Sequence, residues 1–344
     1  MAEIMGLNSP VSEGSALDRE IRGRVWWSLY LSDMWCMCGQ GLHSQLNDVQ
    51  VKIELPINDE TFMSLHSDQV AITGPLEIGI WAQIMTLVPL FGPIHNINLR
   101  IATGGPHTIE LDQQVEQLAQ KLEDWKNDLP PDAQMSQENL HQQQKRGLGG
   151  LLISIHLAYH HYSTLLYFRY LEARRPVSST DRTCMIRCKA HASSFSSLLS
   201  LSRQLKGCDV VHPTVGHMAT VSSAVLVHTL LFGDLDELES VRQELNANFE
   251  ALTELAHYWP ATSTMIESLV VFQDMCLLST ESTTHKMDGW MLRFLTEQSM
   301  DIAAKKMQVN SSSLNAGQEK PSSKAKDLAE QGRYQSFRHP QVLT

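Results

Sequence analysis

Residues 18–56 constrain the fold of this 344-residue chain more than any other stretch, because they gather large aromatic side chains on one short segment. Ser15 followed by Asp18 three positions later is typical of a capped helix start. Gly39 and Gly41 are typical of a helix end, since glycine adopts the left-handed cap at little cost. The helix predicted between these signals buries a large aromatic area in a core, and its aromatic members are Trp26, Trp27, Tyr30 and Trp35.

The same residues resemble a known family. The run Arg-Gly-Arg-Val-Trp-Trp-Ser-Leu-Tyr at 22–30 is followed by Asp33, Gly41 and a closing Leu-Pro at 55–56. This pattern is similar to the regulatory domain of fungal zinc-cluster transcription factors, called the fungal-specific transcription factor domain or middle homology region. The sequence departs from the family pattern at Met34, where an arginine is usual, and at 42–43, where Leu-His replaces Arg-Pro.

The resemblance continues along the chain over about residues 15–300. It includes the Leu-x-x-Trp-x-x-x-Leu-Pro run at 122–130, the His156-x-x-Tyr-His run, and the Trp-Pro pair at 259–260. It implies an all-α regulatory domain. The zinc cluster, its linker and the first helices of the family's regulatory domain are not found ahead of residue 15. We therefore expect a regulator without its DNA-binding head, a truncated gene product, or a descendant with another use.

Charge and composition narrow the class of protein. The net charge of −11 disfavours a phosphate-binding surface, so we expect no direct binding to nucleic acid. A hydrophobic content of 42% suffices for a sizeable core. The amino terminus lacks the basic and apolar regions of a signal peptide, and the apolar stretches at 76–91 and 218–232 are short or interrupted for a membrane span. We expect a nuclear or cytoplasmic protein that is not secreted.

The six cysteines do not form a zinc-cluster pattern. They are scattered along apolar segments as Cys-x-Cys and Cys-x-x-x-Cys, so buried thiols of a reducing compartment are expected. His156 and His160 have the four-residue spacing of helical metal ligands, but hydrogen-bonded helix histidines are the ordinary case. We predict a protein without metal or cofactor.

Helical periodicity runs through nearly the whole chain. The sequence predicts an all-α, single-domain protein of about eight to ten helices over residues 15–308, after a lead-in at 1–14 and before a disordered tail at 309–344. Residues 132–147 read as a polar connection with some helix, and strand alternation is suggested only at 49–53. Helices are expected near 15–38, 76–97 (broken at the prolines 89 and 93), 111–125, 148–171, 182–205, 213–232, 238–255, 262–278 and, more weakly, 288–306.

The aromatic residues have two interpretations. They are core packing, or they line an apolar ligand pocket between helices. If they line a pocket, then Met34, Leu42 and His43, which differ from the family pattern, also face that pocket. No catalytic residue is assigned. The candidate pocket residues are Trp27, Tyr30, Trp35, His43, Trp81 and His160.

Two functions from different classes follow. The first is a transcription-regulator-like domain that senses a small apolar ligand or binds a regulatory protein partner, and that is tied to fungal secondary metabolism. Such a domain could also form a homodimer. The alternative is a cofactor-free enzyme on the same scaffold, a cyclase or pericyclase such as a hetero-Diels–Alderase. Such an enzyme would hold reactants in a near-attack geometry with a few hydrogen-bond donors.

Overall fold

The structure of the protein, a computed structural model, describes residues 6–9, 14–40, 46, 53–72, 78–103, 105, 109–171, 179–279, 292, 294, 327–328 and 330–333. For residues 35–40, 275 and 277–279 it describes the backbone alone. The side chain of Trp35, the His43 loop, all but the last residue of the strand suggested at 49–53, and all but two residues of the helix suggested at 288–306 therefore lie outside the described residues.

The described residues are helical almost throughout, which confirms the all-α prediction. Within them the only β pairing is an isolated bridge between Ile57 and Ile78, and ten of the α-helices have eight residues or more. The α-helices are α1 Ala16–Gln40, α2 Asp59–Ser64, α3 Ile80–Leu87, α4 Phe91–Ala102, α5 Ile109–Asn127, α6 Gln137–Lys145, α7 Gly149–Tyr167, α8 Ser179–Gln204, α9 Pro213–Phe232, α10 Leu238–Tyr258 and α11 Thr262–Ser279. Short 3-10 turns lie at Val88–Leu90, Pro131–Ala133, Phe168–Leu171 and Leu235–Glu237.

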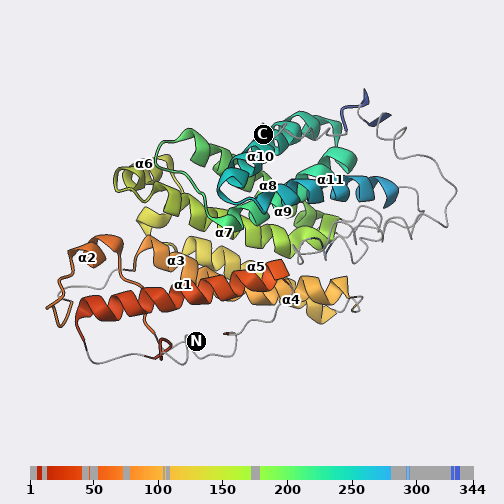
Figure 1. The fold of residues 1–344 in the computed structure, drawn as a ribbon. Helices are drawn as coiled ribbons and strands as arrows, with labels where there is room; N and C mark the ends of the chain where they lie inside the picture. The colour runs from red at the N-terminus through yellow and green to blue at the C-terminus, as the bar shows by residue number, and fades with distance from the viewer. Residues whose placement is uncertain are drawn as a thin grey trace.

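The helices form two layers that meet along α7. Figure 1 shows α1–α5 on one side and α8–α11 on the other. Helix α7 packs against α3, α4 and α5 of the first layer and against α8 and α9 of the second. Its sequence explains this position, because apolar or aromatic residues occupy every face and nearly all of them are buried. One contiguous apolar cluster takes residues from both layers.

Local signals in the sequence fix several helix ends. Ser15 Oγ accepts the backbone N–H of Asp18 at 3.1 Å, and the Asp18 carboxylate accepts the backbone N–H of Ser15 at 3.2 Å, which is the predicted cap of α1. The predicted break near the prolines is also present. Helix α3 ends at Leu87, a 3-10 turn containing Pro89 follows, and Pro93 lies in the first turn of α4, where a missing N–H is tolerated.

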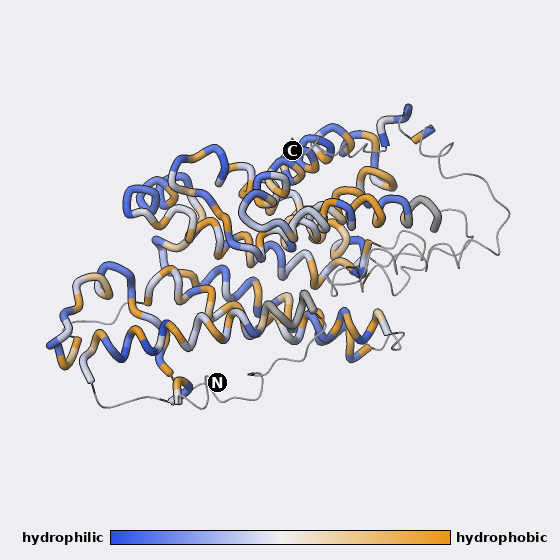
Figure 2. Tube along the Cα trace, viewed as in Figure 1, coloured by the Kyte–Doolittle hydropathy of each residue, from blue (hydrophilic) through white to orange (hydrophobic). Residues whose placement is uncertain are grey.

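The polar segment at 132–147 contains a regular helix. Ser136 accepts the backbone N–H of Asn139 at 3.1 Å and starts α6, which is mostly hydrophilic in Figure 2. Only Leu140 and Gln143 of this helix are buried. Such a helix gives little apolar periodicity, which is why the sequence suggested mainly a connection.

Helix α9 has the bounds that the sequence predicted, Pro213–Phe232. Its 20 residues are long and apolar enough to cross a membrane by length and composition alone, but 94% of its apolar window is buried inside the fold. Every residue from Val215 to Leu231 is buried. Two of its polar residues are satisfied locally, because the Thr220 and Thr229 hydroxyls donate to carbonyls four residues earlier. Helix α9 therefore occupies the position of a central core helix.

Candidate functional site

The aromatic face of α1 packs against the fold and binds the segment that follows it. Trp27 is 6% exposed and its Nε1–H donates to the Glu54 carbonyl at 3.0 Å. Tyr30 meets Trp27 edge to face, with ring centroids 5.6 Å apart, and burial raises the pKa of its hydroxyl. These contacts give both predicted pocket residues a packing role. That Trp27 and Tyr30 form the wall of a ligand pocket stays a prediction. The same holds for Trp35 and His43, whose side chains lie outside the described residues.

Arg24 is the polar centre of this face. Its guanidinium pairs with Glu20 at 2.9 Å and with Asp59 at 2.8 Å, and it donates to the Ile57 carbonyl at 2.8 Å. The same group lies over the ring of Phe62, 4.0 Å from the centroid, and 5.6 Å from the ring centroid of Trp81. Trp81 is half-buried. This predicted pocket residue therefore contacts a cation that is already engaged by carboxylates.

His160 meets a histidine of the neighbouring helix rather than His156. The Nδ1 atoms of His160 and His191 lie 3.0 Å apart, so one neutral ring donates and the other accepts. His156 instead bonds the Ala133 carbonyl at 2.9 Å through Nε2. Burial lowers the pKa of His160 to about 3 and that of His191 to about 4. Across the described residues, no group of three or more His, Cys, Asp or Glu side chains is placed to hold a metal ion.

The cysteines in the described part of the chain fit the expectation of buried thiols. Cys184, Cys188, Cys208 and Cys276 are buried. Burial raises the pKa of each thiol, which keeps it protonated and unreactive at neutral pH. The side chains of Cys36 and Cys38 lie outside the described residues.

A surface cleft of about 250 Å³ lies between the C-terminal halves of α8 and α10. We call it the α8–α10 cleft. The turn between α8 and α9, residues 209–211, forms its third side. Apolar side chains from both helices make its floor, and charged and aromatic side chains make its walls. The lining residues are Leu199, Arg203, Asp209, Val210, Val211, Ala251, Glu254, Leu255, His257 and Tyr258.

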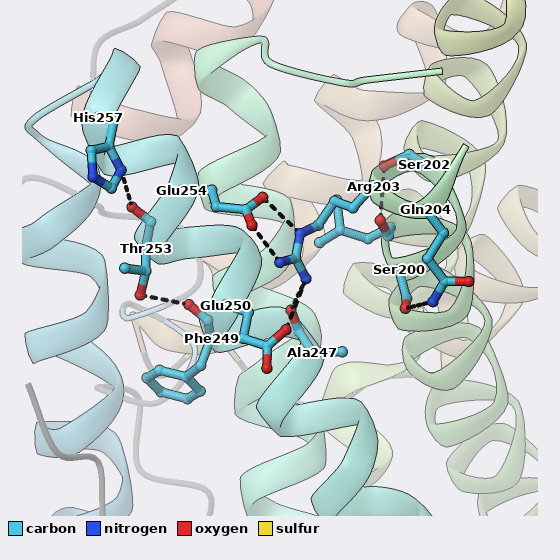
Figure 3. Close-up of polar contacts among 11 residues, drawn as sticks. Ser200, Ser202, Arg203, Gln204, Ala247, Phe249, Glu250, Thr253, Glu254 and His257 are labelled. Carbon is cyan, nitrogen blue, oxygen red and sulfur yellow. Dashed lines mark hydrogen bonds and ion pairs between the residues drawn. The ribbon is translucent and has the colours of Figure 1, made fainter. Parts of the chain in front are cut away.

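One wall of the cleft is held by a network around Arg203 (Figure 3). Arg203 of α8 makes a bidentate pair with Glu254 of α10, with Nε–Oε2 at 2.8 Å and Nη2–Oε1 at 2.6 Å. Its Nη1 also lies 3.3 Å from Glu250 Oε2 and donates to the Ala247 carbonyl at 3.4 Å. The hydrogen bond from Arg203 lowers the pKa of Glu254, so this carboxylate stays ionised at neutral pH. The network fixes α10 against α8.

The rim of the cleft exposes large side chains. Tyr258 is 64% exposed, Val211 45% and Trp259 42%. Trp259 is still held in place, because its Nε1–H donates to the Val211 carbonyl at 2.7 Å. His257 Nδ1 lies 3.0 Å from the Thr253 carbonyl, which can only accept, so Nδ1 carries the proton and Nε2 is the acceptor of the ring. The rim thus combines apolar surface with hydrogen-bond acceptors.

Sequence reasoning did not find this cleft. Most of the residues that line it were assigned to amphipathic helices, and those at 209–211 fell between two predicted helices. One signal was present: Glu250 and Glu254 place two acids one turn apart on α10, and Arg203 is a lone cation near the end of α8. Which cation faces which acids depends on how α8 and α10 pair, and that pairing is not visible in either helix alone.

Comparison with known proteins finds a similarity in the first part of the chain. Residues 1–127 match the family model of the fungal specific transcription factor domain. No curated protein and no solved structure matches the chain. The match covers α1–α5 and includes the Arg-Gly-Arg-Val-Trp-Trp run at 22–27, while the resemblance suggested beyond residue 127 stays a prediction. Residues 1–127 of this chain are thus similar to the fungal specific transcription factor domain.

Proposed function

We propose that this protein is a regulatory module of the transcription-factor type, which binds a protein partner by taking one of its basic side chains into the α8–α10 cleft. The family match over residues 1–127 supports a transcription-regulator-like role. The observation that supports binding of a protein partner is the composition of the cleft. An apolar floor, an exposed aromatic rim and an excess of carboxylates occur together there.

The size of the cleft favours a side chain over a whole small molecule. Pockets that enclose small molecules usually hold about 300–1,000 Å³. The α8–α10 cleft holds about 250 Å³ and opens to the surface between two helices. A long side chain of a partner would fill this space while the rest of the partner covers the rim.

The charge of the cleft favours a basic side chain. Arg203 is the cation of the lining, and its donors are directed to Glu254, Glu250 and the Ala247 carbonyl. Asp209 also lines the cleft and is exposed. Because the carboxylates outnumber the cation, an approaching arginine or lysine gains favourable interactions that an acidic side chain does not.

The rim has the composition of a binding hot spot. Tyrosine and tryptophan are enriched in the parts of protein interfaces that contribute most to affinity. Tyr258 and Trp259 are adjacent and exposed at the end of α10, beside Val211. A partner that covers these rings would bury apolar area around the basic side chain and exclude water from its contact with the carboxylates.

Binding of a small apolar ligand and the cofactor-free cyclase stay predictions, as does a role in secondary metabolism. A transcription-factor domain fits a nuclear or cytoplasmic protein, and the proposed partner would be met there. Product formation from candidate polyene substrates by the purified chain would replace the regulatory proposal with the enzymatic one.

The proposal is tested with a short labelled peptide of alternating leucine and arginine, measured by fluorescence anisotropy. A second peptide carries citrulline in place of arginine, which keeps the size of the side chain and removes its charge. We expect the arginine peptide to bind more tightly. Tyr258→Ala should weaken its binding about tenfold, which corresponds to about 1.4 kcal/mol for a hot-spot aromatic. Asp209→Asn should weaken it about fivefold, close to 1 kcal/mol.

Glu116→Gln is the matched control, because it removes one negative charge from an exposed position of α5 in the other layer. It should leave binding unchanged. Equal losses in Asp209→Asn and Glu116→Gln would mean that the peptide responds only to the net charge of the protein, and the cleft would lose its assigned role.

A further inference from the structure

A segment near the end of the chain docks at the opposite end of α10 from the cleft. Residues 327–333, which we call the C-terminal turn, are described except for residue 329. They contact the corner where α9 ends and α10 begins, almost a hundred residues earlier in the sequence. Leu328 is half-buried and packs against the main apolar cluster.

The C-terminal turn is a short helix with a regular end. The backbone N–H of Gln331 donates to the Asp327 carbonyl at 3.1 Å, and that of Arg333 donates to the Leu328 carbonyl at 2.6 Å. Gly332 lies between them at a φ of +71°. A left-handed glycine followed by a bond back over five residues is the Schellman arrangement that ends many helices. A Cβ on Gly332 would come within 2.7 Å of Arg242 Nη2, the end of a flexible side chain that can shift, so the left-handed φ is what favours glycine here.

The corner of α9 and α10 receives this turn through backbone carbonyls. Arg333 Nη1 donates to the Leu231 carbonyl at 3.3 Å and to the Gly233 carbonyl at 3.0 Å. The last carbonyls of a helix lack intrahelical partners and carry partial negative charge, so a guanidinium is a favourable partner for them. Arg242 of α10 donates to the Gly332 carbonyl in return, while Glu239 holds its other nitrogen at 3.1 Å.

We propose that this corner is a docking site for an arginine-bearing helical turn, and that the chain's own residues 327–333 occupy it as a latch that opens and closes. The contacts are specific but few. Leu328 supplies the apolar contact, whereas Asp327, Glu330 and Gln331 are exposed. The turn belongs to the same chain as the corner, and covalent linkage keeps the local concentration of a docked segment high even when its own affinity is modest.

Hydrogen exchange on the full chain tests the latch directly. The backbone amides of Gln331 and Arg333 should be protected in the wild type, because both donate within the turn. Arg333→Ala should speed their exchange at least tenfold by removing the contacts to α9. Gly332→Ala should do the same without a change of charge, because alanine rarely adopts the left-handed φ of this position. Arg338→Ala, which removes an arginine from the same tail, should leave the protection unchanged.

A peptide tests the docking site in trans. A labelled peptide of residues 324–336 should bind saturably to the full-length Arg333→Ala protein, whose own turn no longer competes. It should bind at least tenfold more weakly to the wild type, and the same peptide with Arg333→Ala should not bind.

Three results would overturn the proposal. These are wild-type amides that exchange as fast as those of the free peptide, equal peptide binding by the wild type and the Arg333→Ala protein, and protection that disappears on dilution. The last result would show that the turn comes from a second copy of the chain.

Discussion

Helices α1 and α9 are both rich in apolar residues, but they are held in the fold by different means. Helix α9 is buried at every position from Val215 to Leu231. Helix α1 has one buried face and exposes a stripe one turn apart, with Ile21, Val25 and Leu29 each more than 40% exposed. Polar side chains compensate on α1, since Arg24 and Trp27 bind the segment at 54–59. Apolar composition therefore does not distinguish a core helix from a surface helix that polar contacts hold in place.

The extent of burial also determines how each helix responds to the loss of a contact. A helix surrounded by other helices contributes mainly to stability, because any change there disturbs close packing on all sides. A helix held on one face by a few directed bonds can lose one of them without losing the core. The described parts of α1 and of the α8–α10 cleft share this character: an engaged arginine beside exposed apolar side chains.

The largest contrast is expected from matched truncations of the two helices. Leu230 of α9 is 0% exposed, whereas Val25 of α1 is 43% exposed. Leu230→Ala should lower the free energy of unfolding by about 2–5 kcal/mol, through lost burial and the cavity left behind. Val25→Ala should change it by less than about 0.5 kcal/mol. Urea unfolding followed by circular dichroism measures both, and similar losses would remove the distinction between the two helices.

The second contrast concerns pH, because buried histidines cluster around α9 and none of the described α1 residues is a histidine. His217 of α9 meets His161 of α7, with ring centroids 5.2 Å apart, and His95 of α4 lies close enough to add to the effect. Burial lowers the pKa of His217 to about 3 and that of His161 well below its ordinary value. In the described residues His217 Nε2 and His161 Nδ1 have no hydrogen-bond partner.

The direction of the pH effect follows from these shifts. Unfolding returns each imidazole to a pKa of about 6.5, so the unfolded state binds more protons below that pH. Stability is therefore complete above about pH 6.5 and is lost as the pH falls from there toward 3. Each such histidine contributes a slope of up to about 1.4 kcal/mol per pH unit.

His217→Gln isolates one histidine of the cluster. The variant should lose less stability than the wild type between pH 7 and pH 5, by about 2 kcal/mol, as measured by urea unfolding at the two pH values. His141→Gln on the exposed face of α6 is the control and should follow the wild type, since that ring meets water in both states. An unchanged difference between the two pH values in His217→Gln would show that other groups set the acid sensitivity.

The sequence predicted both helices, each for a physical reason. The bounds of α9 were predicted correctly, because proline at 213 and glycine at 233 mark its ends and its interior is apolar throughout. The helix expected at 262–278 ends one residue later in the structure. The family resemblance of α1 was also confirmed, because it rests on a local run of residues.

Contacts between distant segments were not predictable in the same way. The pairing of Arg203 with Glu254 and of His160 with His191 depends on which helices become neighbours. The C-terminal turn is a further case. Its glycine and arginine look ordinary in a polar tail, and only the unpaired carbonyls at the end of α9 give them a partner. Periodicity indicates which face of a helix is buried but not which residue lies opposite.

The smallest expected effect tests whether α1 is held by directed bonds at all. Trp27 donates its indole N–H to the Glu54 carbonyl at 3.0 Å, while its ring packs against Tyr30. Trp27→Phe keeps most of the buried aromatic area and removes the donor. Because the Glu54 residue is exposed, its carbonyl can bond to water instead, so the loss should stay near 1 kcal/mol rather than reach the cost of an unsatisfied buried group.

A comparison of two phenylalanine variants separates the hydrogen bond from the change in ring size. Trp26 is 0% exposed and its Nε1 has no hydrogen-bond partner in the described structure, so Trp26→Phe alters packing without breaking a bond. If a directed bond fastens the 53–57 segment to α1, hydrogen exchange in that segment should accelerate in Trp27→Phe and stay unchanged in Trp26→Phe. Equal acceleration in both variants would mean that aromatic packing alone holds α1, and its difference from α9 would be one of degree.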